Sequence, residues 1–180
     1  MKIVSRVSVA ATLLLLAACQ SQNAKSTSGD ANPAEIRFTT NAYQIIEFDR
    51  QEGALAKTEA KSPAVKAIAQ QLTNQANDFA TRLGPTAAAA SITPPSILRN
   101  DLRVRLGQMR VQQGLDFDRT YVADQIASHE ELLLMEGGMG NEGVSPQFAT
   151  LIQQGNSLVQ TNLEKLRALQ RQMGSARAPR

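Results

Sequence analysis

The 180-residue sequence is poor in the side chains that make crosslinks, stacking surfaces and metal sites. It has no tryptophan, two tyrosines and five phenylalanines, so it offers no obvious stacking surface for sugars or nucleic-acid bases. Its one cysteine excludes an intrachain disulfide, and stability must therefore come from packing. Its one histidine excludes the two Glu-x-x-His pairs of a di-iron helical bundle.

Long apolar runs are also missing, apart from one near the N-terminus. Lys2 and Arg6 precede an apolar stretch at residues 7–18, which is too short to cross a bilayer as a stable helix. A short basic segment followed by such a stretch is typical of a secretory signal peptide. We therefore predict that residues 1–18 are an export signal and are removed.

The apolar stretch closes on Leu16-Ala17-Ala18-Cys19, which resembles the bacterial lipobox. This resemblance implies that the Cys19 thiol is acylated, and buried methylenes at about 0.8 kcal/mol each would then anchor the chain to a membrane. Gln20, rather than aspartate, follows the cysteine, which by the usual sorting rule favours the periplasmic face of the outer membrane over the inner membrane. A buried cysteine beside an ordinary cleavage site is the alternative interpretation.

Composition limits the mature chain to one nearly neutral domain. Removing 18 residues from 180 leaves 162, enough for one core and too few for two. Because Lys2 and Arg6 leave with the signal, 17 basic residues remain against 16 acidic ones, a formal charge of +1. A nucleic-acid partner is therefore not expected.

The segments on either side of the domain lack large apolar residues. Residues 19–32 combine the predicted lipidated N-terminus with a polar stretch that we interpret as a flexible tether. Residues 33–173 are the predicted helical domain. Residues 174–180, with Arg177 and Arg180, form a short basic tail.

Three helix starts are marked by a capping residue followed by proline. These are Asn32-Pro33, Ser62-Pro63 and Ser145-Pro146, and Glu35 is placed to complete a capping box at the first of them. A shorter helix can start at residues 93–95, and a central helix is expected after Gly114.

The expected helix ends are set by glycine and proline. The first helix should run to about Lys61, and Gly84-Pro85 should end the second. The glycine-rich residues 137–141 should form a flexible turn after the central helix. No strand precedes them, so a phosphate-binding loop has almost no support.

Apolar residues recur at steps of three and four in each segment, which predicts amphipathic helices. Asp49 and Glu52 interrupt this stripe in the first helix. The stripe of the second helix is Val65, Ile68, Leu72, Ala76, Phe79 and Leu83. That of the third is Leu98, Leu102, Leu106 and Met109. That of the central helix is Val122, Ile126, His129 and Leu133.

These helices and their short connections predict an all-α fold. Four long amphipathic helices and one shorter one, with no alternating run long enough for a sheet, indicate an up-and-down four-helix bundle with one additional shorter helix.

Few residues are candidates for chemistry. No serine is marked as an activated nucleophile, and the single cysteine is assigned to lipid. Asp49 and Glu52 lie one turn apart and could act as acid and base, but surface pairs of this kind are common. We therefore expect no enzymatic activity.

A metal site at His129 is the more serious alternative. The residue three before it is Ile126, so the Glu-x-x-His pattern is absent. A site made from His129 and carboxylates of other helices stays possible, although a lone histidine on a half-apolar face is more often a hydrogen-bonded core residue. Arginines of the third helix, Arg99, Arg103, Arg105 and Arg110, form either a solvated face or a contact for anionic lipid or cell-wall polymer.

Several tracts together resemble a known family. They are residues 53–56, residues 62–66 with Ala69 and Leu72, and Phe117-Asp118 with Tyr121 and His129. Over roughly residues 36–170 they are similar to a widespread family of exported bacterial proteins with a ferritin-like bundle, the domain of unknown function numbered 4142.

The resemblance implies positions for a polar layer. Family members carry an acidic residue in the first helix, an Asp-His pair in the second, tyrosine and histidine in the central helix, and histidine in the last. Asp49, Tyr121 and His129 match, whereas Gln75-Ala76 and Asn162 replace the other ligating residues. We therefore expect no metal or cofactor, and a buried layer joined by mutual hydrogen bonds.

The sequence thus favours a lipid-anchored, non-catalytic bundle with a binding or envelope-maintenance role. The membrane is its expected partner through the acyl anchor, and an envelope protein or cell-wall polymer is a further possible partner. The alternative is a degenerate ferritin-like metal-binding or redox protein. A third interpretation is an adaptor whose arginine-bearing helix docks a partner.

Overall fold

The computed structural model describes residues 31–175, which form five α-helices and one short 3₁₀ helix. The elements are α1 (Pro33–Glu59), α2 (Pro63–Ala89), α3 (Asn100–Met109), α4 (Gly114–Glu136), η1 (Met139–Asn141) and α5 (Pro146–Ser175). The predicted signal peptide, Cys19 and residues 20–30 lie outside the described residues, as do residues 176–180. Between residues 31 and 175, no helix has both the length and the apolar character that crossing a membrane would need.

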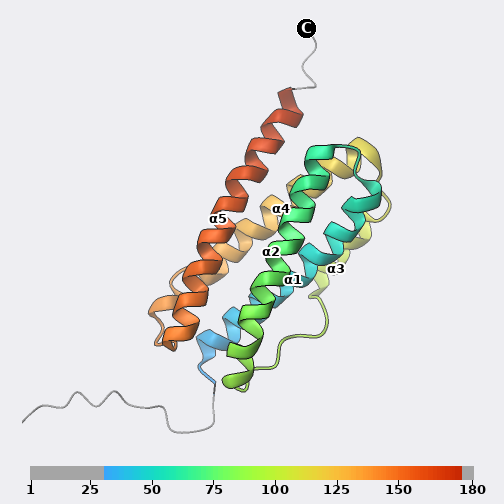
Figure 1. The fold of residues 1–180 in the computed structure, drawn as a ribbon. Helices are drawn as coiled ribbons and strands as arrows, with labels where there is room; N and C mark the ends of the chain where they lie inside the picture. Colours follow the sequence, from blue (N-terminus) through green and yellow to red (C-terminus); the bar gives the residue numbers. More distant parts are fainter. Residues whose placement is uncertain (1–30, 176–180) are drawn as a thin grey trace, which may run out of the picture. The chain divides into compact units, whose positions relative to one another are not determined.

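The four long helices pack into a bundle (Figure 1). α1 and α2 form one hairpin and α4 and α5 another, and the hairpins meet where α1 packs on α4 and α2 on α5. The predicted class, an all-α ferritin-like four-helix bundle with one additional shorter helix, is confirmed.

The short helix α3 belongs to the connection that carries the chain from α2 back to the start of α4. The backbone of Ala60, after α1, pairs with Gly114 at the start of α4. The ring of Phe38, early in α1, lies 6.2 Å from that of Phe148, early in α5. α1 is therefore antiparallel to α4 and parallel to α5, and one long crossover of this kind occurs in ferritin-like bundles. The predicted up-and-down order is not followed strictly, because α2 and α4 run in the same direction.

The three predicted helix starts are confirmed. The Asn32 side chain accepts a hydrogen bond from the Ala34 N–H at 2.8 Å, and Ser62 Oγ accepts one from the Val65 N–H at 3.4 Å. α5 begins at Pro146, as expected. A proline in the first turn costs no hydrogen bond because its missing N–H would have had no partner.

The predicted capping box at Glu35 is wrong. Its carboxylate instead accepts a hydrogen bond from the backbone N–H of Ser145 at 2.7 Å. Glu35 therefore holds the residue that precedes α5, and it ties the beginnings of the two parallel helices together.

The predicted end of the second helix is also wrong. α2 continues past Pro85 to Ala89. The residue before a proline resists the helical conformation partly because its Cβ meets the ring, and Gly84 has no Cβ. The alanines that follow are the strongest helix formers. α5 likewise runs to Ser175, two residues into the predicted basic tail.

The stripes predicted for α2 and α3 are the buried faces of those helices. Every residue of the two predicted stripes, from Val65 to Leu83 and from Leu98 to Met109, is at most 9% exposed. Edge-to-face contacts of Phe38 with Phe79 and Phe148 fill one end of the core. Phe117 stacks on Tyr121 near the other end.

The stripe predicted for the central helix is only half correct. Val122 and His129 are buried, but Ile126 and Leu133 are partly exposed. The inner face of α4 carries Gln125 and Leu132 in their place. The buried face is thus turned by about one residue, and it brings a polar side chain into the core.

Candidate functional site

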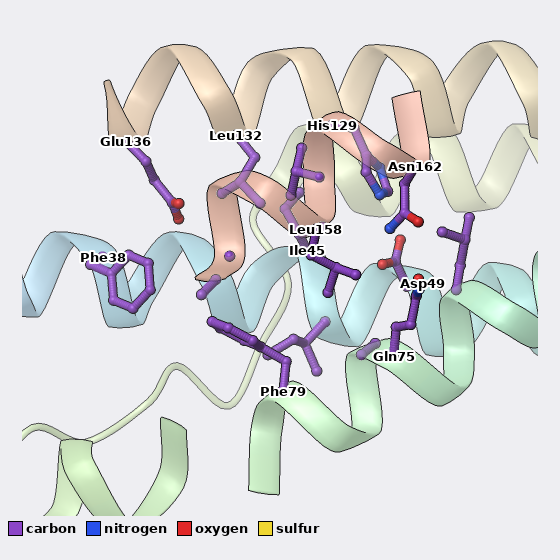
Figure 2. A pocket seen from close by; sticks show the side chains of 16 residues that line it. Phe38, Ile45, Asp49, Gln75, Phe79, His129, Leu132, Glu136, Leu158 and Asn162 are labelled. Atoms are coloured by element: carbon purple, nitrogen blue, oxygen red, sulfur yellow. The ribbon is translucent and has the colours of Figure 1, made fainter. Parts of the chain in front are cut away.

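A small cavity lies inside the bundle between α1, α2, α4 and α5. Its volume is about 50 Å³ and most of its lining is apolar. At about 10–15 Å³ for each water, this space holds about three water molecules. Figure 2 shows four polar side chains gathered at one end of it, and Glu136 near Phe38 towards the other.

The structure brings four of the predicted site residues together around this cavity. Asp49 of α1, Gln75 of α2, His129 of α4 and Asn162 of α5 all line it, so each of the four long helices contributes one polar side chain (Figure 2). Tyr121 does not line the cavity and lies in the apolar cluster around Phe117.

The expectation of mutual hydrogen bonds within this layer is wrong. In the described part of the chain, no hydrogen bond joins any two of these four residues. Asn162 instead accepts one from Gln71 at 3.4 Å. The Gln75 carbonyl oxygen is buried without a partner. The layer is therefore incompletely satisfied by protein groups.

Gln125 is the partner of both acidic residues of α1. Its amide nitrogen donates to Asp49 Oδ1 at 3.0 Å and to Glu52 Oε2 at 2.7 Å. All three side chains are buried. One amide thus donates a hydrogen bond to each of two carboxyl groups, which the helical spacing places side by side.

Burial changes the charge of these carboxyl groups. It raises the pKa of Asp49 to about 7, against the lowering effect of the Gln125 hydrogen bond. It raises the pKa of Glu52 well above its usual range, again mainly by desolvation. A buried carboxyl group that loses its water favours the neutral form. Burial therefore favours the neutral form of Glu52, while Asp49 is close to its midpoint at neutral pH.

Tyr121 lies near Asp49 and Glu52 but makes no hydrogen bond to either of them. Desolvation, followed by the nearby Asp49 and Glu52, raises the pKa of its phenol well above the ordinary value. Its hydroxyl is buried and has no hydrogen-bond partner within residues 31–175.

His129 is held in its neutral form. Burial lowers its pKa to about 4, with a smaller opposing effect from the backbone carbonyl of Gln125. Its Nδ1 atom is buried and makes no hydrogen bond of good geometry with another described residue. A neutral imidazole beside protonatable carboxyl groups offers a lone pair or an N–H, but no positive charge.

Glu136 is a further buried acid that the sequence did not single out. Burial raises its pKa to about 8, and its Oε1 atom has no partner within the described residues. It lines the cavity two turns along α4 from His129. The cavity therefore has a protonated carboxyl group at each end near pH 6.

These groups are a weak basis for metal binding as they stand. Residues 31–175 contain no group of three or more His, Cys, Asp or Glu side chains arranged to hold an ion. A cation at this layer would need Asp49 and Glu52 to give up protons that burial favours. Amide oxygens of Gln75 and Asn162 would have to supply further ligands.

Sequence reasoning missed Gln125 and Glu136. Both lie on the Tyr121 and His129 side of α4, at steps of four or seven, so helical spacing contained the signal. Glutamine and glutamate usually face solvent, so these residue types give no reason to expect the two side chains in the core.

Several residues that carry the family resemblance have structural roles. Asp118 is fully buried, and its carboxylate accepts hydrogen bonds from the backbone N–H groups of Lys61 and Ser62 at 3.0 and 2.9 Å. It therefore holds the turn between α1 and α2 from a third helix. Gly53 lets α1 approach Thr73 of α2 closely.

The arginines of α3 divide into two groups. Arg99 pairs with Asp101 and Glu131, and Arg105 bonds to Asp124 and lies over the Phe48 ring. Arg103 and Arg110 are exposed, and neither has an acidic partner within the described residues. The guanidinium groups of the second pair are therefore not neutralised by a described acid, although Arg103 bonds to the Asn100 side chain.

Comparison with known proteins supplies a family and a fold. The sequence matches the model of a family described as a domain of unknown function, DUF4142, over residues 20–169. A crystal structure of a DUF305 fragment from Deinococcus radiodurans superposes with a TM-score of 0.72 at 11% identity, covering 80% of this chain and 99% of that chain. That likeness concerns the fold alone. No curated protein matches the chain.

Proposed function

The chain belongs to the DUF4142 family of domains of unknown function, and from this premise we propose that it is a lipid-anchored, non-catalytic helical bundle. In this proposal it stands on the periplasmic face of the outer membrane and acts through binding or envelope maintenance. An envelope protein or a cell-wall polymer would be its partner.

The size of the buried site carries the non-catalytic part of the proposal. The convergent polar groups surround a cavity of only about 50 Å³, whereas small-molecule sites usually enclose hundreds of cubic ångströms. No organic substrate fits beside Asp49 and His129 without opening the bundle. Among the described residues, no serine, threonine or cysteine lines the cavity, so no hydroxyl or thiol nucleophile stands beside these groups.

The anchoring part rests on the Leu16-Ala17-Ala18-Cys19 motif and is tested at Cys19. Intact-mass spectrometry of the chain from the membrane fraction should give the mass from residue 19 plus acyl groups. Incorporation of labelled palmitate should be lost in Cys19→Ser. An unmodified Cys19 on the wild-type chain would overturn the proposed membrane anchoring.

The binding part is tested by crosslinking in intact envelopes. An exposed position on each of α2, α3 and α5 carries a photocrosslinking residue in turn. Reproducible adducts confined to one helix would support a defined partner. A uniform absence of adducts from all three helices would contradict a binding role.

Degenerate ferritin-like metal or redox binding is the second candidate. It is favoured by the unpartnered polar atoms of Glu52, Gln75 and His129 in one region of the core. Metal analysis of protein purified without a His-tag, beside His129→Ala, separates the two proposals. Stoichiometric iron, zinc or manganese that disappears in the variant would replace our preferred proposal with this one.

A further inference from the structure

Exposed apolar side chains are concentrated around α3. Six large apolar residues between positions 31 and 175 are strongly exposed, and four of them fall within residues 97–115. Ile97 is 69% exposed, Val104 51% and Val111 83%. Isolated exposed aliphatic residues are normal, but a group on one short segment marks a surface that meets something less polar than water.

Two arginines without an acidic partner among the described residues lie in the same segment as these exposed apolar side chains, and one of them, Arg103, bonds to the Asn100 side chain. Arg103 directly precedes Val104 in α3, and Arg110 directly precedes Val111 in the turn after the helix. Neither arginine has an acidic partner within the described residues. The acid on this helix, Asp101, is paired with Arg99.

The contacts made by the buried side of α3 determine which of its side chains are exposed. Leu98, Leu102, Leu106 and Met109 are all buried against the bundle. The Gln44 side chain accepts from the Arg99 N–H at 2.7 Å and donates to the Ile97 carbonyl at 3.0 Å. Arg105 donates to the Asp124 carbonyl at 2.6 Å. α3 is therefore packed against α1 and α4, and the exposed apolar side chains of this segment do not take part in that packing. Figure 1 shows α3 beside α1.

We propose that the exposed surface of the segment around α3 rests on the anionic phospholipid surface of the membrane that holds the acyl anchor. This surface is formed by Ile97 before the helix, Arg103 and Val104 within it, and Arg110 and Val111 directly after it. Aliphatic side chains would enter the headgroup boundary, and the guanidinium groups would bind lipid phosphates. This inference rests on the proposed acylation of Cys19.

The length of chain between anchor and domain is compatible with this contact. Eleven residues lie between Cys19 and Ala31, and the twelve Cα–Cα steps that join the two span at most about 40 Å. Three stacked layers of helices are about 30 Å thick at about 10 Å for each. The anchor can therefore stay in the bilayer while the bundle lies on it with α3 downwards.

The test uses the full acylated protein reconstituted in vesicles. Because acylation blocks the thiol of Cys19, Val104→Cys introduces a single reactive thiol for an environment-sensitive fluorophore. Leu134→Cys on α4, where the native side chain is 83% exposed, is the matched control. Nitroxide-labelled lipids report contact in vesicles of phosphatidylethanolamine with phosphatidylglycerol, and in phosphatidylcholine alone.

We expect quenching of the Val104 label in the anionic vesicles and none of the Leu134 label. Replacing Arg103 or Arg110 by glutamine should weaken the contact by about fivefold each. Three results would overturn the inference: a Val104 label open to water, equal quenching at both positions, or a label shielded without lipid quenching, as in a contact between copies. Intact mass separates the two proposals, since an unacylated chain refutes the anchor and this contact together.

Discussion

Gly53 of α1 faces Thr73 of α2 so closely that a Cβ added at Gly53 would lie 2.0 Å from the Thr73 hydroxyl oxygen. The same position would lie 3.5 Å from the carbonyl oxygen of Ala69. The hairpin of α1 and α2 therefore requires a residue without a side chain at this point.

Gly53→Ala should destabilise the domain, because Thr73 must move or the helices must separate. We expect a loss of about 1–3 kcal/mol, measured by thermal or urea unfolding. Adding Thr73→Ala should recover most of the loss. Gly107→Ala on α3, where nothing lies within 4 Å of an added Cβ, should instead be neutral or stabilising by about 0.5–1 kcal/mol. Equal effects of the two alanines would contradict a close approach at Gly53.

Asp118→Ala should loosen the turn between the first two helices. It leaves the N–H groups of Lys61 and Ser62 without their carboxylate partner, at a cost of about 1–3 kcal/mol. Asp116→Ala, an exposed acid one half-turn earlier on the same helix, is the control and should change stability by less than about 0.5 kcal/mol. Urea unfolding followed by circular dichroism distinguishes them.

Leu72→Asp should unfold the domain. Leu72 is 1% exposed and lies in the core on α2, and an unpaired buried carboxylate costs several kcal/mol. Leu134→Asp, at a position that is 83% exposed, should leave the melting temperature within a few degrees of wild type. A similar melting temperature for both variants would show that the stripe of α2 is not a core.

Stability should fall as pH rises across the neutral range. Unfolding lowers the pKa of Asp49 from about 7 towards 3.8 and that of Glu136 from about 8 towards 4.5. Folding therefore takes up protons between these values, and each group removes about 1.4 kcal/mol for each pH unit until its folded pKa is passed. The contribution of His129 to the pH dependence has the opposite sign, since its folded pKa of about 4 lies below its unfolded value of 6.5. It lowers the stability only as the pH falls through this range.

Asp49→Asn and Glu136→Gln should therefore raise stability at pH 8 and flatten its decline between pH 5 and pH 8. Both replacements keep the shape of the side chain without a charge to bury. Glu164→Gln on the exposed side of α5 is the control and should leave the profile unchanged. A wild-type profile that is level from pH 5 to pH 8 would contradict neutral carboxyl groups in the core. The measurement is urea unfolding at a series of pH values.

Helix starts are the part of the fold most accessible from the sequence. Asn32, Ser62 and Ser145 mark them because an exposed N–H needs an acceptor there and the following proline needs none. Pro85 misleads because its effect depends on the glycine before it and on the alanines after it. Glu35 is assigned the wrong partner because its carboxylate accepts its hydrogen bond from the backbone N–H of Ser145, 110 positions away.

The candidate site can be predicted only in part from the sequence, for a related reason. The positions of Asp49, Gln75, His129 and Asn162 follow from the family resemblance and do meet around one cavity. Their hydrogen bonds do not follow, because Gln125 and Glu136 are polar residues whose burial is decided by the rotation of α4. Ile126 and Leu133 are apolar and directly follow the buried Gln125 and Leu132, so the apolar pattern alone assigns the wrong face.

The parallel course of α1 and α5 also has a mechanical meaning. Pro33 lies at one end of the bundle and Ser175 at the other, so a force applied between them acts along the helix axes. Side-chain contacts along the whole length of the helices must then slip together rather than part in sequence. A domain pulled between its two ends would therefore resist such shear far better than a hairpin pulled open from one end.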